Sequence, residues 1–400
     1  MHSVNESLNI ILNHSVTVEN EQIPLAEALY RVLSENIIST VDIPSYNQSA
    51  VDGYAINTSH FKPNIKWTVA GEIKAGDTDE VKNTNRSDVQ SPVTFKIFTG
   101  ALVPDNVDAV IMKEFARNEN NQVMFDVSSV KFFQNIRRSG EELQKGEIVF
   151  RESTFIQPEH IAVLAGIGQQ SVKVRKKLRV VIAVTGNELK SIDERIALKA
   201  GEKYESNGIM LQNLLKKYFY HSVPIVLLKD DKEEMYRYLK EATEIYDVII
   251  TTGGVSVGDY DFTKEIIQKL GFKILIDKVA QKPGKPFVFA VKGNKVIFGL
   301  PGNPRAVLSC FYVYVLRFIL RCYKIDEKNF LREIELPIDA DIEIKDNKTR
   351  ILFVNIEDNK IKVPEKQDSH MLISAANADG IILVEKSIKK GELIKTSLLR

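Results

Sequence analysis

Hydrophobic residues recur every three or four positions at the start of the chain, which predicts amphipathic helices. Residues 4–12 place their aliphatic side chains on one helical face. Residues 24–35 repeat this spacing, and Pro24 suits the first turn of a helix. We therefore expect the chain to open with two helices, over residues 4–12 and 24–35.

The pattern then shortens to β-rich runs. Between about residues 41 and 137, the runs WTVAGEI, VTFKIFTG, DAVIMKE and QVMFDV are separated by clusters of Pro, Gly, Asn and Asp, which predicts an all-β segment. Residues 138–170 return to helical and loop character. Residues 329–400 alternate apolar and polar positions in short pieces, which predicts a small β-barrel or sandwich.

From about residue 178, apolar strands alternate with helical patterns. LRVVIAVTG and YDVIITTGG are continuous apolar runs, as expected for strands buried on both faces. NGIMLQNLLKKYF, with Asn207 as its expected N-cap, and DKEEMYRYLKEATEI have helical periodicity. This alternation predicts a doubly wound α/β domain with a mainly parallel sheet, and the polar residues 191–205 are expected to form a surface loop. The expected fold class is therefore multidomain α/β.

The composition narrows the function classes. The chain has 400 residues, of which 44% are hydrophobic and 27% charged, which favours roughly two to four folded domains over disorder. Lys plus Arg is 54 and Asp plus Glu is 53, so the formal net charge is +1. A nucleic-acid-binding protein typically has a clear basic excess, so we expect no nucleic-acid partner.

Cysteine and hydropathy point to a reducing compartment. Cys310 and Cys322 are the only cysteines, too few for a disulfide framework or a Cys-rich metal site, and the six histidines lack zinc-ligand spacing. The most apolar stretch, residues 306–320, has about 15 residues, short of the roughly 20 that span a bilayer. The N-terminal segment carries Glu6 and no basic start, unlike a signal peptide. We expect a cytoplasmic protein without a membrane partner.

The strongest candidate for chemistry lies where a buried strand ends. TTGGVSVGDYDFTKE, residues 251–265, follows a strand and precedes a helix, at the edge where α/β sheets bind ligands. Its glycines let the backbone approach a ligand, and the helix N-terminus offers N–H groups to an anion. Asp259 and Asp261 can hold Mg²⁺. The alternative is a tight turn whose aspartates cap the next helix.

Three shorter motifs follow strands or turns in the same part of the chain. TGNEL, residues 185–189, places Glu188 where it can contact a ribose hydroxyl or a metal. KPGKP, residues 282–286, sets two lysines on a Pro-Gly turn, which suits an oxyanion. LPGNP, residues 300–304, forms a stiff loop suited to a phosphate or pterin. The alternatives are a plain turn, a solvated basic turn and a helix cap at Asn303.

Three further segments lie earlier in the chain: SAVDGYA (49–55), TGALVPDNVDAV (99–110) and RRSGEE (137–142). Taken singly, an Asp-Gly turn, a Pro-Asp turn and surface ion pairing account for them. In their order along the chain, however, all seven segments closely resemble the MoeA family, the molybdopterin molybdenumtransferases, which are related to the gephyrin E domain. The resemblance covers essentially the whole chain and is strongest between about residues 44 and 310.

The resemblance implies an elongated homodimer of four-domain subunits. The expected domains are a discontinuous helical linker domain (residues 1–44 plus 138–172), a β-rich domain (45–137), a MogA-like α/β domain that binds molybdopterin (173–326) and a C-terminal β-barrel (327–400). The implied activity is the Mg²⁺-dependent insertion of molybdate into adenylylated molybdopterin, with release of AMP. A MogA-type adenylyltransferase and apo-molybdoenzymes are the implied protein partners.

The motifs also give the candidate site residues. The expected catalytic residues are Asp52, which the resemblance places near the site across the dimer interface, Thr99, Glu142, Glu188, Asp261, Lys282 and Lys285. The expected cofactor-binding residues are Thr185, Gly186, Asp230, Asp231, Gly253, Gly254, Ser256, Pro301, Gly302, Asn303, Pro304, Arg350 and Ser369. The expected metal ligands are Glu188, Asp259 and Asp261.

The chain departs from the family pattern at two positions. Glu142 stands where the family typically has Asp, so its carboxylate sits one methylene further out, which matters for Mg²⁺ because this ion demands near-octahedral geometry. The Phe-x-Arg pattern of the fourth domain reads RILFVNI here, which leaves Arg350 as the candidate basic residue. The alternative functions are a MogA-like adenylyltransferase, a gephyrin-like dimeric scaffold and a tungstate-handling relative.

Overall fold

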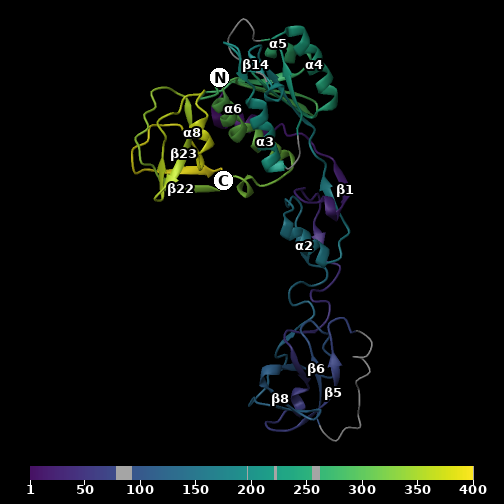
Figure 1. Ribbon diagram of the computed structural model, residues 1–400. Coiled ribbons are helices and arrows are strands. Elements are labelled where there is room, and N and C mark those ends of the chain that lie inside the picture. The colour runs from purple at the N-terminus through teal and green to yellow at the C-terminus, as the bar shows by residue number, and fades with distance from the viewer. Residues whose placement is uncertain (78–91, 196, 220–222, 255–261, 400) are drawn as a thin grey trace. The chain divides into compact units, whose positions relative to one another are not determined.

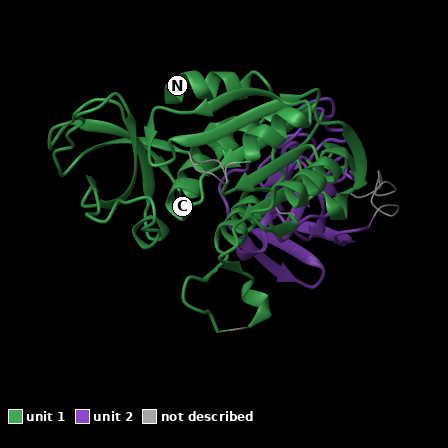
Figure 2. Ribbon diagram, turned by 90° about the horizontal axis from the view of Figure 1, so that it is seen from above, with its two compact units in different colours: residues 1–34, 153–157, 171–400 green, residues 35–152, 158–170 purple. Residues whose placement is uncertain are grey.

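The computed structural model describes residues 1–77, 92–195, 197–219, 223–254 and 262–399 (Figure 1). The chain divides into two compact units, which Figure 2 colours separately. Unit 1 comprises residues 1–34, 153–157 and 171–400, and unit 2 comprises residues 35–152 and 158–170.

A six-stranded sheet of described residues forms the centre of unit 1. Its order is β16 (Ile225–Leu228), β13 (Val180–Thr185), β17 (Val248–Thr252), β21 (Lys295–Leu300), β20 (Pro286–Lys292) and β18 (Lys273–Lys278). The first four strands in this order are parallel and the last two are antiparallel to their neighbours. The predicted α/β fold class with a mainly parallel sheet is therefore confirmed.

Helices cover both faces of this sheet. One core contains side chains of α1 (Val4–Leu12), α3 (Asn207–Phe219), α6 (Pro304–Cys310), the π turn η6 (Phe311–Val315) and α7 (Leu316–Cys322). The opposite core contains side chains of α4 (Lys232–Ile245) and α5 (Thr263–Lys269). Strand β13 alternates between them: Val180, Ile182 and Val184 enter the first core, and Val181 and Ala183 enter the second. This alternation explains its uninterrupted apolar sequence.

The two helices expected at the start of the chain have different outcomes. Helix α1 is confirmed, and a reciprocal capping box between Ser3 and Glu6 fixes its first turn. The helix expected over 24–35 is wrong: β1 (Asn20–Pro24) pairs with β12 (Ser171–Arg175), and only a 3₁₀ turn, η1 (Leu25–Glu27), follows. Beyond it, Tyr30 has φ 60° and Val32 bridges to Phe155. These long-range pairings override the local periodicity.

The C-terminal region of unit 1 forms a second sheet. Among the described residues, its order is β19 (Gln281–Lys282), β23 (Thr349–Glu357), β25 (Gly380–Val384), β26 (Leu393–Leu398) and β22 (Glu333–Pro337), with β24 (Lys360–Lys362) paired to β23. The short helices are η7 (Glu327–Asn329) and α8 (Ile373–Ala376). The predicted β character of this region is confirmed. In β19, the KPGKP segment itself joins the sheet, because Lys282 pairs with Arg350.

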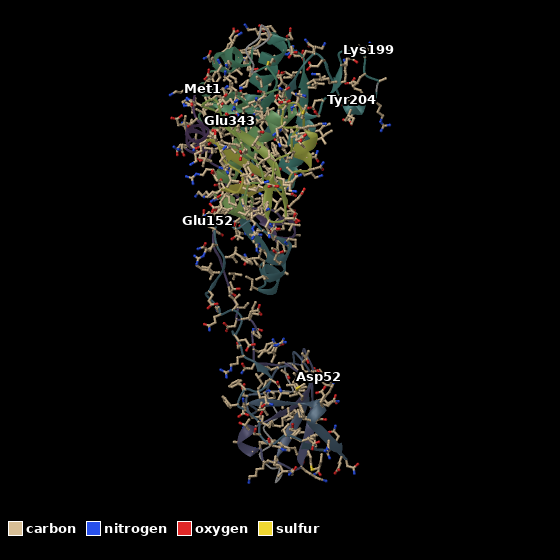
Figure 3. The ribbon with its side chains drawn as sticks, turned by 90° about the vertical axis from the view of Figure 1, so that its left-hand side faces the viewer. Met1, Asp52, Glu152, Lys199, Tyr204 and Glu343 are labelled. Atoms are coloured by element: carbon tan, nitrogen blue, oxygen red, sulfur yellow. The ribbon has the colours of Figure 1, made fainter. Side chains whose placement is uncertain are left out.

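Residues 189–204 form a long loop of unit 1, here called the excursion. The segment runs through β14 (Leu189–Lys190) and the 3₁₀ turn η5 (Ile192–Glu194) to β15 (Lys203–Tyr204), which pairs in parallel with β14. Lys199 and Tyr204 lie on this excursion in Figure 3. Most of its described side chains are exposed, which agrees with the predicted surface loop.

Unit 2 is mainly β, as predicted for residues 41–137. In the described ranges its main sheet has the order β7 (Ala109–Met112), β4 (Gly53–Ile56), β6 (Val93–Ile97), β5 (Trp67–Ile73), β9 (Gln122–Phe125) and β8 (Ala116–Glu119). Separate small cores lie around Phe95 and around Trp67. The remaining elements are β2 (Ile37–Ile38), β3 (Gln48–Ser49), η2 (Thr58–His60), η4 (Lys113–Phe115), β10 (Ile136–Arg137), β11 (Ile148–Phe150) and α2 (Pro158–Gly166).

The long apolar run near residue 310 is the buried α6–α7 segment. Within the described ranges, no helix combines the length and the apolar character that a bilayer span requires.

Candidate functional site

The carboxyl ends of the four parallel strands bring the predicted loops of unit 1 to one edge of the sheet. TGNEL begins at the last residue of β13, Asp230 follows β16, TTGG begins in β17, and LPGNP begins at the last residue of β21. Because parallel strands end at the same edge, motifs far apart in the sequence become neighbours. Two adjoining pockets open there.

The first pocket, here called the acidic pocket, has a volume of about 530 Å³. Three carboxylates face it, from Glu188, Glu205 and Asp230, together with Lys203 and His370. Its other walls come from the strand ends and loops: Thr185, Gly186, Leu189, Tyr204, Ser206, Asn207, Thr252, Gly253, Gly254, Gly302, Asn303 and Pro304. The structure thus brings together most of the predicted residues from TGNEL, TTGG and LPGNP.

Two loops of the acidic pocket are fastened to each other by a reciprocal pair of hydrogen bonds. The Asn187 backbone N–H donates to Asp230 Oδ2 at 3.0 Å, and the Asp230 backbone N–H donates to Asn187 Oδ1 at 3.1 Å. The neighbouring Asp231 instead caps α4, where it accepts the Glu234 N–H at 2.8 Å. The two adjacent acids therefore differ: Asp230 lines the pocket, and Asp231 ends a helix.

The glycine turn after β17 requires residues without side chains. Gly253 has φ +87°, and a Cβ there would lie 2.7 Å from both the carbonyl oxygen and Oγ1 of Thr185. Thr185 is buried, and its hydroxyl donates to the Thr252 carbonyl at 3.2 Å. The turn thus presses its backbone against the end of β13, which leaves backbone atoms rather than side chains at the pocket wall.

The second pocket, here called the lysine pocket, has a volume of about 710 Å³. Four basic residues line it, Lys282, Lys285, Lys348 and Arg350, against the two acids Glu365 and Asp368. The rest of the lining is Gly253, Gly254, Gln281, Pro283, Gly284, Pro286, Pro301, Gly302, Asn303, Ala306, Ile351, Leu352, Gln367 and Ser369. Gly253, Gly254, Gly302 and Asn303 line both pockets, so the TTGG and LPGNP turns form their shared wall.

The charges of the lysine pocket are only partly neutralised. Arg350 and Lys348 both pair with Asp346, at 2.8 and 3.0 Å. Lys282 and Lys285 are exposed and form no ion pair within the described residues. Their positive charges are therefore available to an anion.

A buried glutamine holds the KPGKP turn in place. Gln281 is almost fully buried; its Nε2 donates to the Gly284 carbonyl at 3.0 Å, and its Oε1 accepts a short hydrogen bond from the hydroxyl of Tyr314. Gly284 has φ +87°, and a Cβ there would lie 2.7 Å from Gln281 Nε2. Sequence reasoning missed Gln281 and Tyr314, because their partnership joins positions 33 residues apart.

The LPGNP loop is also held by side chains that the sequence did not reveal. Asn207 Nδ2 donates to the Gly302 carbonyl at 2.8 Å, and Asn303 Nδ2 donates to Ser369 Oγ at 2.8 Å. Asn303 is the N-cap residue of α6, as the capping alternative expected, but its side chain makes no capping hydrogen bond. Asn207 is likewise the first residue of α3 rather than its cap, and the Glu205 carboxylate accepts the Gly208 N–H instead.

Two predicted residues of unit 2 form a cluster of their own. Asp52 Oδ1 accepts the backbone N–H of Thr99 at 3.0 Å and its hydroxyl at 2.9 Å, and Asp52 Oδ2 accepts Lys113 Nζ at 3.2 Å. The Thr99 backbone donor, followed by its hydroxyl and Lys113, lowers the pKa of Asp52 to about 2. Asp52 is labelled in Figure 3. It is therefore a solvent-accessible carboxylate that is ionised at neutral pH.

The other predicted residues are not joined to these groups. Glu142 is exposed, and the hydrogen bonds of Asp52 run to Thr99 and Lys113 rather than toward it. Ser256, Asp259 and Asp261 lie outside the described residues.

The acidic pocket has the donor chemistry for Mg²⁺. Magnesium prefers hard oxygen ligands and is commonly held by one or two carboxylates plus substrate phosphates. Glu188 and Asp230 supply such carboxylates at the sheet edge, and the ammonium of Lys203 lies 3.7 Å from Glu188. Among the described residues, no group of three or more potential ligand side chains is close enough to hold the ion without other ligands. A magnesium ion held by Glu188 and Asp230 would therefore need further ligands, such as phosphate oxygens of a substrate.

The fold and the site together define an α/β protein with two adjoining pockets at a glycine-lined edge of its parallel sheet. Comparison with known families agrees. Residues 2–168 match the MoeA N-terminal region, domains I and II, and residues 181–321 match a probable molybdopterin-binding domain. The chain belongs to the MoeA family of molybdopterin molybdenumtransferases.

Named relatives cover most of the chain. A molybdopterin molybdenumtransferase of Haemophilus influenzae is 32% identical over 94% of this chain and 93% of its own length. One from Staphylococcus epidermidis is 35% identical over 78% of this chain and 74% of its own length. A crystal structure of the molybdopterin biosynthesis MoeA protein of Pyrococcus horikoshii superposes with a TM-score of 0.82 at 28% identity, over the full length of both chains. The family resemblance read from the motifs is thus confirmed.

Proposed function

We propose that this protein is a molybdopterin molybdenumtransferase, which inserts molybdate into adenylylated molybdopterin and releases AMP. The observation that carries the proposal is the pair of adjoining pockets with opposite charge and a shared glycine wall. The reaction has to bring together a phosphoanhydride with its cation and a separate oxyanion. Two pockets of this kind meet both needs side by side.

In this proposal the acidic pocket receives the adenylyl phosphates. Glu188 and Asp230 would hold Mg²⁺ against the phosphate oxygens, with Asp259 and Asp261 as further candidate ligands. The bound ion would neutralise the charge that develops as AMP leaves. The backbone of Gly253 and Gly254 allows a phosphate to approach the sheet edge without a side chain in the way.

The lysine pocket receives molybdate. Lys282 and Lys285 attract the oxyanion, and Arg350 and Ser369 line the same pocket. Because molybdate must lose an oxo group when the dithiolene sulfurs bind molybdenum, the pocket has to hold a hard oxyanion beside a soft acceptor. Fixed cations that orient molybdate next to the shared wall serve this purpose.

Asp52, Thr99 and Glu142 belong to the proposal through the family motif. We propose a homodimer in which Asp52 of one subunit acts at the pockets of the other. Its low pKa supports a role as a charged group at neutral pH rather than as a proton donor. A cytoplasmic location is proposed as well, supported by two buried cysteines that form no disulfide.

The test is a reaction of purified protein with adenylylated molybdopterin, molybdate and Mg²⁺. AMP release and reconstitution of a cofactor-free molybdenum enzyme are followed together in the wild type, Glu188→Gln and Lys285→Met. Lys389→Met is the matched control, because Lys389 is an exposed lysine outside both pockets. We expect both readouts to depend on molybdate and to fall at least about tenfold in the two pocket variants only.

If adenylylated molybdopterin binds but is neither cleaved nor loaded with molybdenum, the proposal is overturned and a scaffold function is favoured. AMP release without reconstitution would separate hydrolysis from metal insertion, and would also count against the transferase.

A further inference from the structure

Arg305 is a buried cation without a hydrogen-bonding partner. It is the second residue of α6, directly after the LPGNP loop, and its side chain is fully buried. Within the described residues, none of its three guanidinium nitrogens has a hydrogen-bond partner. Its Cζ lies 5.6 Å from the centre of the Phe353 ring, a cation–π contact that fixes the position of the charge.

This placement is unfavourable for stability. A buried ion loses its hydration, and without a hydrogen-bonded counter-ion little compensates for that loss. The first turn of a helix is also the wrong end for a cation, because the helix dipole is positive there. Burial lowers the pKa of Arg305 to about 10, which still leaves the group charged at neutral pH, and Asp368 opposes this shift. Arg305 therefore carries a fixed positive charge that destabilises the fold.

The charge lies immediately behind the wall of the lysine pocket. Ala306, the next residue in the chain, and Asn303, two residues before Arg305, line that pocket, and so does Asp368, the acid whose charge acts on Arg305. The backbone N–H of Arg305 donates to the carbonyl of Ser369, another lining residue, at 3.2 Å. The guanidinium is fully buried and so is surrounded by protein rather than bulk solvent, which screens its field only weakly.

We infer that Arg305 is a specificity-determining residue of the lysine pocket, whose buried charge favours a dianionic oxyanion over a monoanionic one. The inference rests on the proposed function, since it takes the lysine pocket as the oxyanion site. The interaction of a fixed charge with a ligand scales with the ligand's charge. Removing the charge should therefore weaken the binding of a dianion more than that of a monoanion of the same shape. The factor of weakening for the dianion should be about the square of the factor for the monoanion.

The test compares two tetrahedral oxyanions, molybdate and perrhenate, by isothermal titration calorimetry. Arg305→Met removes the charge while keeping an unbranched side chain, and Arg305→Lys retains the charge. We expect Arg305→Met to bind molybdate about tenfold more weakly than the wild type and perrhenate about threefold more weakly. Arg305→Lys should bind both anions with an affinity close to that of the wild type. Because Arg305→Met also removes a buried unpartnered ion, its melting temperature should rise by about 2 to 4 °C.

A gain in stability together with a loss of dianion affinity is a combination that a merely structural arginine would not produce. Lys285→Met serves as the reference for the pocket itself. If Lys285→Met weakens molybdate binding and Arg305→Met does not, or if both anions weaken by the same factor, the inference is overturned while the proposed function stands. If the wild-type protein binds no molybdate, both fail. Should Arg305→Met not fold, Arg305→Gln makes the same comparison with a neutral polar side chain.

Discussion

Asp52 is held in its charged form mainly by a single residue, Thr99, which supplies both a backbone and a hydroxyl donor. Thr99→Val keeps the backbone N–H and removes only the hydroxyl. We therefore expect the pKa of Asp52 to rise part of the way from about 2 toward its ordinary 3.8. Carboxyl-carbon NMR titration measures this directly. Thr58→Val is the control, because the Thr58 hydroxyl donates to Asp108 in the same unit and makes no hydrogen bond to Asp52.

The sign of the pH dependence follows from the depressed pKa. Because the folded-state pKa lies below the unfolded value, Asp52 contributes stability above about pH 4, which is lost as the pH falls through about 2. Acid unfolding of Thr99→Val should accordingly begin at a higher pH than in the wild type. An unchanged Asp52 titration in Thr99→Val would contradict the hydrogen-bond explanation.

Gly253 is required both by its positive φ and by the lack of space for a Cβ atom. Gly253→Ala would combine the strain of a positive φ with a Cβ 2.7 Å from Thr185. We expect it to lower the free energy of unfolding by about 3 kcal/mol, of which about 1–2 kcal/mol is backbone strain and the rest overpacking. Gly293 also has a positive φ but no atom within 4 Å of its Cβ position, so Gly293→Ala should show the strain alone. If urea denaturation shows the same loss of unfolding free energy for Gly253→Ala and Gly293→Ala, the steric contribution at Gly253 is excluded.

At the level of elements, the sequence predicted those whose signal is local. The capping residues Ser3 and Glu6 and the apolar face of residues 4–12 lie within one segment, and α1 forms as expected. Residues 24–35 carry an equally regular pattern, yet their aliphatic side chains pack through pairings with residues 155 and 171–175. No local rule contains that competing partner. Long-range strand pairing therefore decided the one element that was predicted incorrectly.

The π turn in the apolar helix links the core to the lysine pocket. Tyr314 lies in η6 and donates to Gln281, which in turn holds the KPGKP turn through Gly284. We expect Tyr314→Phe to raise the KM for molybdate about three- to tenfold while kcat changes little, because the lysines lose their fixed position but not their charge. Steady-state kinetics with varied molybdate measures this.

Tyr312→Phe provides the matched control for Tyr314→Phe. Tyr312 is a buried tyrosine of the same π turn, but its hydroxyl oxygen accepts a hydrogen bond from Tyr218. Both variants should lose about 1–2 kcal/mol of stability, since each leaves a buried polar atom without its partner. Only Tyr314→Phe should change the KM. Equal KM changes would mean that loss of core stability, rather than positioning of the turn, explains the effect.

At the level of the whole molecule, the motifs predicted the sheet-edge loops but only part of the pocket walls. TGNEL, TTGG, KPGKP and LPGNP are continuous segments with glycines and prolines at strand ends, so their place at the edge follows from the strand order. His370, Gln367 and Asp368 come from the C-terminal region, and Lys203 comes from the excursion beside the acidic pocket. Their positions depend on how separate sheets pack within unit 1, which no local pattern encodes.

The proposed exchange of Asp52 between subunits makes a prediction about mixtures of two inactive variants. Asp52→Ala and Lys285→Met place their lesions in unit 2 and unit 1, respectively. If each site takes Asp52 from the other subunit, a mixed dimer has one site with both lesions and one intact site. Random mixing in equal amounts makes about half of the dimers mixed, so about a quarter of wild-type activity should return.

The opposite arrangement gives a different result. If each chain supplied its own Asp52, every site in the mixture would carry one lesion, and activity would stay at the level of the separate variants. The assay is AMP release after the two variants are unfolded together and refolded, with each variant treated alone as the control. Mass measurement of the refolded material establishes that mixed dimers are present, so that lack of recovery argues against shared sites rather than against assembly.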